Sequence, residues 1–160
     1  MTGAALKSRG LEPFQRRYIH DLVTLLLTGQ AQAAAQLFAR YTEDIRTHRL
    51  PLADFAQREV LSTSPKAYQE KLARGETRRS AAYELALKSG REYEQGDTVV
   101  FYLIGDKKNI AVTDGAKLLG AAQPGERDEN VAYYLDKLAK LQEKFREFVT
   151  VAEPDTLTLT

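Results

Sequence analysis

Residues 98–104 read Thr-Val-Val-Phe-Tyr-Leu-Ile, and this stretch decides the fold class. An unbroken run of β-branched and aromatic residues favours a strand over a helix. Residues 105–108 are Gly-Asp-Lys-Lys, which is typical of a turn, and residues 109–112 are Asn-Ile-Ala-Val, which predicts a return strand. Because the first run is apolar at consecutive positions, we expect its strand to be covered on both faces.

Helical patterns lie on both sides of this hairpin. Apolar residues recur at three- and four-residue spacing over residues 14–27, 31–45 and 131–148. Pro13 suits the first turn of the first helix, and Gly29 ends it. The sequence therefore predicts an α+β fold that is mostly helical, with one small β-hairpin.

Capping residues mark the expected starts of the other helices. Ser64, followed by proline, is typical of a helix N-cap, and Gly75 closes the short helix or turn that it begins. Thr77 is predicted to cap the next helix, which ends at Gly90. Asp128 is predicted to cap the long C-terminal helix.

Composition excludes several classes of protein. The 160 residues suit one domain, and the absence of cysteine removes disulfides, thiolate zinc sites and cysteine nucleophiles. The longest apolar run, residues 22–27, is interrupted by Thr24 and is far shorter than the roughly 20 residues of a membrane span. The first residues lack the pattern of a secretion signal, so we expect a cytoplasmic protein without a membrane partner.

Residues that could perform catalysis are scattered. His20 and His48 are far apart in sequence, and the chain has neither a Gly-x-Ser-x-Gly elbow nor a glycine-rich phosphate loop. Asp97 lacks the second carboxylate that a two-metal site needs, which makes it a turn residue. We therefore predict no catalytic residue, no metal ligand and no cofactor in this chain.

Charge is unevenly distributed along the chain. Residues 1–80 contain 13 lysines and arginines against 8 acidic residues, whereas residues 81–160 contain 10 against 14, for a net charge of +1. Such asymmetry fits a face that meets a polyanion, and it also fits chance variation in a mixed surface.

Basic residues gather in three groups. The first comprises Lys7, Arg9, Arg16 and Arg17; the second comprises Lys66, Lys71 and Arg74 around Tyr68; the third comprises Arg78 and Arg79 at the predicted helix start beside Thr77 and Ser80. Arginines and hydroxyls at a helix N-terminus suit phosphate oxygens, and such contacts position a nucleic acid without reading its sequence. The alternative is an ordinary solvated cluster.

Several short motifs occur in a particular order over residues 7–148. They are Arg9-Gly10-Leu11-Glu12 before Arg16-Arg17, then Leu50-Pro51-Leu52, Leu61-Ser62-Thr63 with Tyr68, Arg78-Arg79-Ser80-Ala81-Ala82, Gln95-Gly96-Asp97-Thr98-Val99, Tyr102-Leu103-Ile104, and Asp128 with Tyr133-Tyr134. In this order and spacing the chain resembles the C-terminal thumb domain of family B DNA polymerases.

The resemblance implies a polymerase-thumb-like fold. Residues 1–148 would form a duplex-binding domain in which residues 1–12 are the junction to the palm domain. Residues 149–160, where threonine alternates with leucine after Pro154, could form an edge strand, but we expect a disordered tail. The resemblance further implies a thumb that grips the primer–template duplex through its sugar–phosphate backbone and supports processive synthesis.

The resemblance also implies a set of DNA-binding residues. Near the palm junction these are Arg9, Arg16 and Arg17, and on the thumb face they are Thr63, Lys66, Tyr68, Arg78 and Arg79. The chain departs from the family pattern at Tyr18, where an acidic residue is usual, and at Arg78-Arg79, where archaeal relatives have Pro-His. The second departure adds positive charge.

The palm motifs with their metal-binding aspartates are missing, so polymerase activity cannot reside in this chain alone. We expect an excised fragment, rather than a split-gene product, of a nucleotidyltransferase that binds magnesium only in its palm, and we expect a monomer. The acidic C-terminal half and the amphipathic last helix support a different hypothesis, a helical protein-interaction module that does not bind nucleic acid. A small independent enzyme is disfavoured by the missing catalytic residues.

Overall fold

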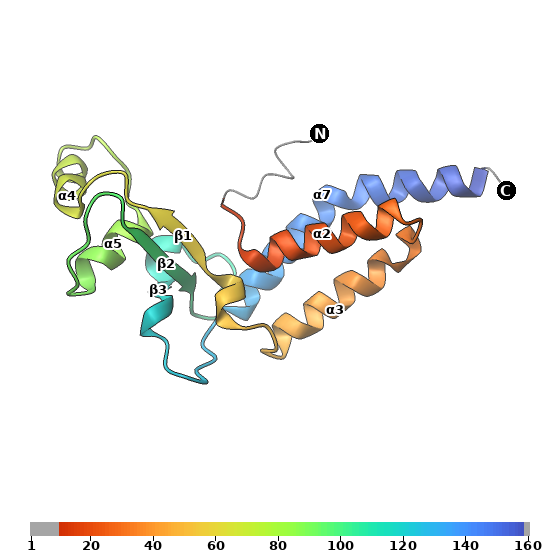
Figure 1. The fold of residues 1–160 in the computed structure, drawn as a ribbon, viewed down its shortest axis with the longest axis horizontal. Helices are drawn as coiled ribbons and strands as arrows, with labels where there is room; N and C mark the ends of the chain where they lie inside the picture. The colour runs from red at the N-terminus through yellow and green to blue at the C-terminus, as the bar shows by residue number, and fades with distance from the viewer. Residues whose placement is uncertain (1–9, 159–160) are drawn as a thin grey trace.

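The elements of the chain form two lobes that share one long strand (Figure 1). The computed structural model describes residues 10–158, and for residues 147–158 it describes the backbone only. The helical lobe contains α2 (Pro13–Leu27), α3 (Ala34–Arg46) after the 3-10 turn η1 (Ala31–Ala33), and α7 (Val131–Thr158). The sheet lobe contains β1 (Gln57–Val60), α4 (Pro65–Ala73), α5 (Ala81–Lys88), β2 (Thr98–Leu103), α6 (Val112–Gly115), β3 (Ala116–Leu118) and the 3-10 turn η3 (Leu119–Ala121). The 3-10 turn η2 (Leu52–Phe55) connects the helical lobe to β1. The predicted α+β class is confirmed.

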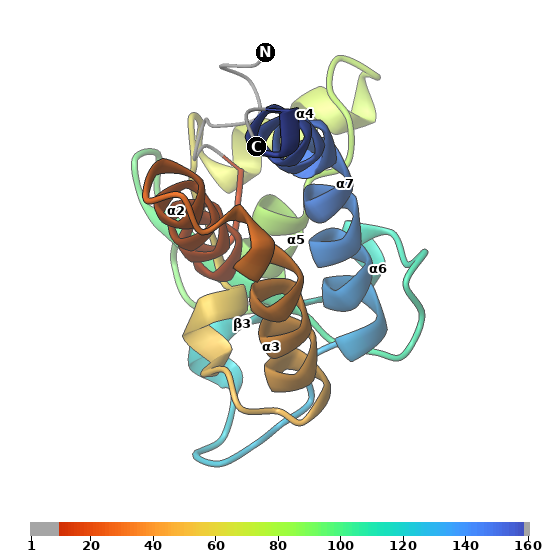
Figure 2. The same ribbon diagram turned by 90° about the vertical axis from the view of Figure 1, so that its right-hand side faces the viewer.

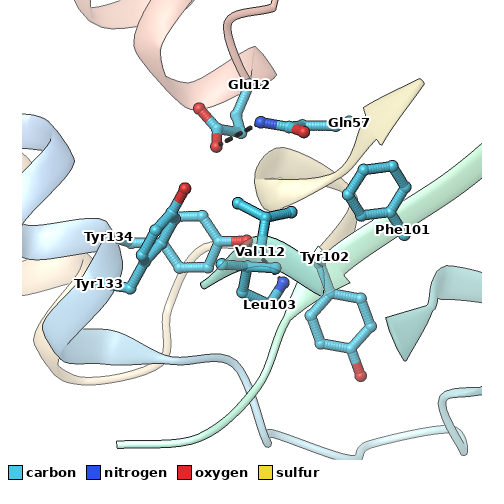
Figure 3. A pocket seen from close by; sticks show the side chains of 8 residues that line it. All are labelled: Glu12, Gln57, Phe101, Tyr102, Leu103, Val112, Tyr133 and Tyr134. Carbon is cyan, nitrogen blue, oxygen red and sulfur yellow. Dashed lines mark hydrogen bonds between the residues drawn. The ribbon is translucent and has the colours of Figure 1, made fainter. Parts of the chain in front are cut away.

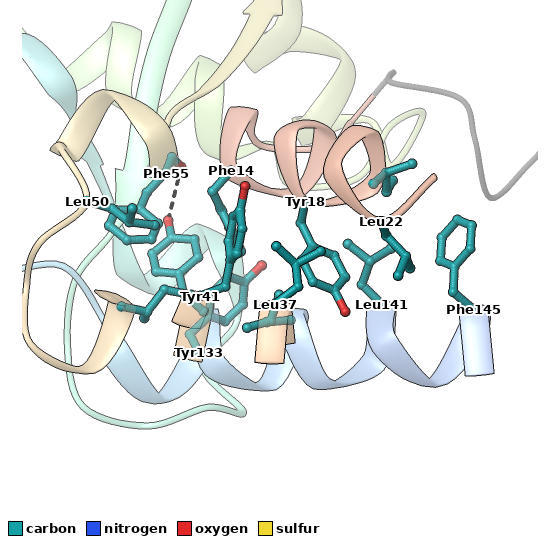
Figure 4. Packing of buried hydrophobic residues seen from close by; sticks show 14 of the residues in the cluster. Phe14, Tyr18, Leu22, Leu37, Tyr41, Leu50, Phe55, Tyr133, Leu141 and Phe145 are labelled. Atoms are coloured by element: carbon teal, nitrogen blue, oxygen red, sulfur yellow. Dashed lines mark hydrogen bonds between the residues drawn. The ribbon is translucent and has the colours of Figure 1, made fainter. Parts of the chain in front are cut away.

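The three helices of the helical lobe lie side by side (Figure 2). Pro13 stands at the first helical position of α2, and Gly29 follows its end with φ +73°, a backbone conformation that glycine adopts without strain. The apolar stripes predicted from the sequence face one another in one buried cluster (Figure 4). Its central members are Phe14, Tyr18, Leu22, Leu37, Tyr41, Ile45, Tyr134, Leu138 and Leu141.

The sheet is antiparallel, in the order β1-β2-β3. The strand predicted at 98–104 is confirmed as β2, but the predicted return strand at 109–112 is wrong, because β3 follows only at 116–118. The reason is a contact that is distant in the chain: the side-chain amide of Asn130 donates to the carbonyls of Ile104 and Lys107, which binds the turn to a side chain instead of a neighbouring strand. Ile110 then packs against Gly115. A Cβ at position 115 would lie only 2.8 Å from the Cδ1 atom of Ile110, so the close packing depends on glycine.

The sequence did not predict β1. Its residues are Gln-Arg-Glu-Val, and the last three are exposed, so no apolar alternation marks it as a strand. Pairing with β2 depends on backbone hydrogen bonds, which any residue except proline can make. The strand is short and polar, as edge strands commonly are.

Only one face of the sheet is fully covered. Val99 and Phe101 on β2 pack with α5 in a second buried cluster that includes Tyr83. On the other face Val100 is half-buried, and Val60 on β1 has an exposed fraction of 62%. The expectation that the strand is covered on both faces is therefore wrong for the first half of β2, which leaves an open surface beside β1.

Two of the predicted helix caps are wrong and one is confirmed. Ser64 caps α4 by accepting a hydrogen bond from the Ala67 N–H at 3.1 Å. Helix α5 begins at Ala81 after Ser80, four residues beyond the predicted cap Thr77. The Ser80 N–H donates to the Tyr68 hydroxyl, which holds the chain in an extended conformation before the helix. Arg78 and Arg79 consequently lie in the segment that precedes α5.

The cap of α7 is Asn130, whose Oδ1 accepts from the Tyr133 N–H at 3.0 Å. Asp128, which the sequence predicts as the cap, lies two residues upstream of the cap position and instead contacts Tyr102 and Lys117. The helix continues to Thr158, whereas a disordered tail was expected from residue 149. Extending a helix that already has several turns requires no new nucleus, so α7 can continue through residues 149–158.

The segment before α7 places two carboxylates in contact with cations. Burial disfavours the ionised form of Glu129, but hydrogen bonds from Arg127 and His48 outweigh it and hold the pKa of Glu129 below its ordinary value. Burial likewise opposes ionisation of Asp128, and hydrogen bonds from Lys117 and Tyr102 lower its pKa on balance.

These two carboxylates should make the free energy of unfolding fall in acid. A pKa that is lower in the folded state means that the unfolded chain binds more protons, so this stabilisation is present above the unfolded pKa of about 4 and is lost as the pH falls through the folded values. Urea unfolding between pH 7 and pH 3 measures the effect. The double variant Asp128→Asn/Glu129→Gln should show a shallower fall, and equal slopes for the two proteins would contradict the assignment.

Candidate nucleic-acid interface

A groove of about 730 Å³ runs between the two lobes on the open side of the sheet. One wall comes from the first turn of α2, with Arg16, and the other comes from β1, with Arg58. The floor includes Val100 of β2, which pairs with Arg58 across the sheet. At its far end the groove reaches Ser62, four residues before Lys66 in the first turn of α4.

Both arginines of the groove are available to a bound anion. Arg16 is exposed and donates one hydrogen bond to the Leu11 carbonyl at 2.7 Å, which leaves most of its five N–H groups free. Arg58 is exposed on β1, and neither side chain forms an ion pair with any residue that the structure describes. The groove contains one carboxylate, that of Glu59, so its side chains carry a net positive charge.

Two backbone N–H groups of β1 lie along the free edge of the sheet. The Leu61 N–H donates to the Asp97 carbonyl at 2.8 Å, and bonded residues alternate along an antiparallel strand. The N–H groups of Arg58 and Val60 therefore point away from β2, along the free edge of the sheet. Backbone N–H groups are common donors to phosphate oxygens.

The second group of exposed cations lies in the sheet lobe. Lys66 is exposed in the first turn of α4, and Arg78 is exposed in the segment before α5. Neither forms an ion pair within residues 10–146. The Tyr68 hydroxyl accepts from the Ser80 N–H at 2.9 Å, which ties the segment that carries Arg78 to the helix that carries Lys66.

Arg17 and Arg79 are paired with carboxylates. Arg17 donates to Asp54 at 2.8 Å, lies over the ring of Tyr41, and links α2 to η2; the hydrogen bond to Asp54 raises its pKa. Arg79 makes a two-pronged contact with Glu84 at 2.8 and 2.9 Å, which raises its pKa in the same way. A bound phosphate would have to compete with these carboxylates.

Tyr68 and Thr63 hold the sheet lobe together. Tyr68 has an exposed fraction of 3% and stacks on Tyr83 with ring centroids 4.5 Å apart, so it does not form part of a binding surface. The Thr63 N–H donates to the Tyr83 hydroxyl at 3.0 Å, and the Thr63 side chain is half-buried. These residues position the neighbouring cations and contribute little contact area of their own.

The structure thus separates the predicted DNA-binding residues into three sets. Arg16 lines the groove, Lys66 and Arg78 lie exposed in the sheet lobe, and Arg17, Thr63, Tyr68 and Arg79 are engaged by the protein itself. Arg9 lies outside the described residues. Sequence reasoning missed Arg58, because it lies between a glutamine and a glutamate in a strand with no apolar pattern, and recognition of β1 would have been needed to find it.

Two kinds of functional feature are absent from the described part of the chain. Within residues 10–146, histidine and carboxylate side chains form no group of three or more that could hold a metal ion. No helix in that range combines the length and apolar character needed to cross a bilayer. Comparison with protein-family models finds no family that matches the chain, and no curated protein matches it either.

Proposed function

We propose that this chain is a non-catalytic thumb module of a family B DNA polymerase that grips primer–template duplex DNA through the sugar–phosphate backbone. The observation that carries the proposal is the groove between the lobes, where Arg16 and Arg58 extend from opposite walls without carboxylate partners among the described residues. Lys66 and Arg78 are two further exposed cations, and both lie in the sheet lobe. The order of family-like motifs along the chain supports the same function.

In this proposal the chain positions DNA for chemistry performed elsewhere. Cations and outward N–H groups contact phosphates and hold the duplex without reading its sequence. The remainder of the polymerase would supply the palm, its aspartates and their magnesium ions. The module would act as a monomer in the cytoplasm.

Salt-dependent binding to a primer–template tests the proposal. Fluorescence anisotropy with a labelled duplex should show an association constant whose logarithm falls with the logarithm of the salt concentration, by about 0.9 per phosphate neutralised. Arg16→Ala/Arg58→Ala should weaken binding and reduce this slope by about 2, since each lost phosphate contact removes about one unit. Lys66→Ala/Arg78→Ala should act in the same direction.

A matched control is Arg46→Ala/Arg49→Ala, which removes the same formal charge from two arginines that are paired with carboxylates. Its affinity and slope should stay close to those of the wild type. Absence of salt-dependent binding at low ionic strength, or an equal loss in the control, would contradict the proposal. In that case the protein-interaction hypothesis is favoured, and light scattering with candidate partners tests it.

A further inference from the structure

The two walls of the groove belong to different lobes. Arg16 is on α2, which packs into the cluster of the helical lobe, and Arg58 is on β1 of the sheet lobe. Strand β2 contributes to both clusters, with Phe101 in one and Leu103 in the other. The distance between the two arginines is therefore set by whatever joins α2 to β1.

Glu12 lies at this junction. It is the residue before α2, and only 1% of its surface is exposed. Its carboxylate accepts one hydrogen bond from Gln15, one turn along α2, and another from Gln57, the first residue of β1, at 3.2 Å (Figure 3). Gln57 lines the groove as well, directly beside Arg58.

The surroundings of this carboxylate are dry. Beneath it is a small cavity lined by Gln57, Phe101, Leu103 and Tyr134, which leaves no space for a water molecule. Among the described residues Glu12 has no ion-pair partner, so two neutral side-chain amides satisfy it. Burying a carboxylate costs free energy that such hydrogen bonds only partly offset, and packing alone would favour an apolar residue.

We propose that Glu12 is a positioning residue that, through Gln57, fixes the separation of α2 and β1 and hence of Arg16 and Arg58 across the groove. The hydrogen bond to Gln57 is the part that crosses between the lobes, whereas the bond to Gln15 stays within one helix turn. The statement about lobe geometry stands on the contacts alone; its consequence for DNA rests on the proposed function.

The absence of cysteine makes the separation measurable. Spin labels on His20→Cys, at a position whose side chain is 80% exposed on α2, and on Gln69→Cys, exposed on α4, report the distance between the lobes by double electron–electron resonance. Glu12→Leu and Gln57→Leu should each shift or broaden the distance distribution. The single variant Glu12→Gln, which keeps an oxygen acceptor toward Gln57, should give the same distance distribution as the wild type.

Gln15→Leu is the matched control. It removes the other hydrogen bond of Glu12 and leaves the hydrogen bond between the lobes in place, so its distribution should equal that of the wild type. If Glu12→Leu fails to fold by circular dichroism, Gln57→Leu still tests the same hydrogen bond from the half-buried strand side. Wild-type distributions in folded Glu12→Leu and Gln57→Leu would overturn the proposal.

DNA binding tests the consequence. Both leucine variants should bind the labelled primer–template roughly tenfold more weakly. Because Gln57 lines the groove and Glu12 does not, the loss in Glu12→Leu is the one that reports a residue that modulates a site without contacting its ligand. Altered distances with unchanged affinity would overturn the link to DNA. Failure of the wild type to bind any duplex would overturn the proposed function, while the distance measurement would still decide the role of Glu12.

Discussion

Tyr134→Phe should lower the free energy of unfolding by about 3 kcal/mol, although it removes a single oxygen atom. The hydroxyl accepts from the Leu103 N–H at 2.9 Å and donates to the Phe55 carbonyl at 3.2 Å. Phenylalanine keeps the stacked contact with Phe55 but leaves two buried backbone groups without a partner, each of which costs about 1–3 kcal/mol. The hydroxyl therefore links α7, η2 and β2 at the point where the lobes meet.

Urea unfolding followed by circular dichroism measures this loss. The neighbouring tyrosine provides the control: Tyr133 is also buried, but its hydroxyl makes no hydrogen bond among the described residues. Tyr133→Phe should change the free energy of unfolding by about 0.5 kcal/mol or less. Equal losses for the two variants would contradict the prediction, because they would show that the two hydrogen bonds of the Tyr134 hydroxyl add no stabilisation beyond that of the unbonded Tyr133 hydroxyl.

Asn130→Ala should be at least as damaging, with a loss of about 3–4 kcal/mol from one missing cap and two orphaned carbonyls. Asn130 is completely buried, and its side chain makes three hydrogen bonds. Its Oδ1 caps α7, and its Nδ2 binds the Ile104 carbonyl at 3.2 Å and the Lys107 carbonyl at 3.0 Å. The variant would therefore fray the helix and release the turn at once.

A serine at the same position separates these two contributions. Asn130→Ser keeps a hydroxyl that can cap the helix but loses both bonds to the turn, so it should be about 1 kcal/mol more stable than the alanine variant. Thermal unfolding of the two variants side by side provides the comparison. If serine and alanine are equally destabilising, the cap contributes nothing and the turn carries the whole effect.

The long helices could be predicted from sequence because their information is local. Pro13 and Gly29 delimit α2, and three- and four-residue spacing marks the faces that α2, α3 and α7 bury. Strand β1 and the position of β3 could not be predicted, since they depend on partners distant in the chain. The turn after β2 is held by the side chain of Asn130, which is 23 residues beyond Lys107 in the chain.

The sequence predicts only part of the candidate site, again because side chains are paired with partners that are distant in the chain. A sequence indicates which residues are basic but not which are already paired. Arg17 and Arg79 were selected beside Arg16 and Arg78, and only the fold reveals that Asp54 and Glu84 engage them. Tyr68 was selected as a surface aromatic, whereas its stacking on Tyr83 shows that it belongs to a core.

The free edge of β1 also limits how copies of this chain can associate. If two copies joined their sheets edge to edge, the outward groups of Arg58 and Val60 would have to face those of the other copy. The two antiparallel registers with the most overlap place either Arg58 opposite Arg58 or Glu59 opposite Glu59. Like charges directly opposite are repulsive, so the strand resists the sheet-to-sheet aggregation to which bare edges are prone.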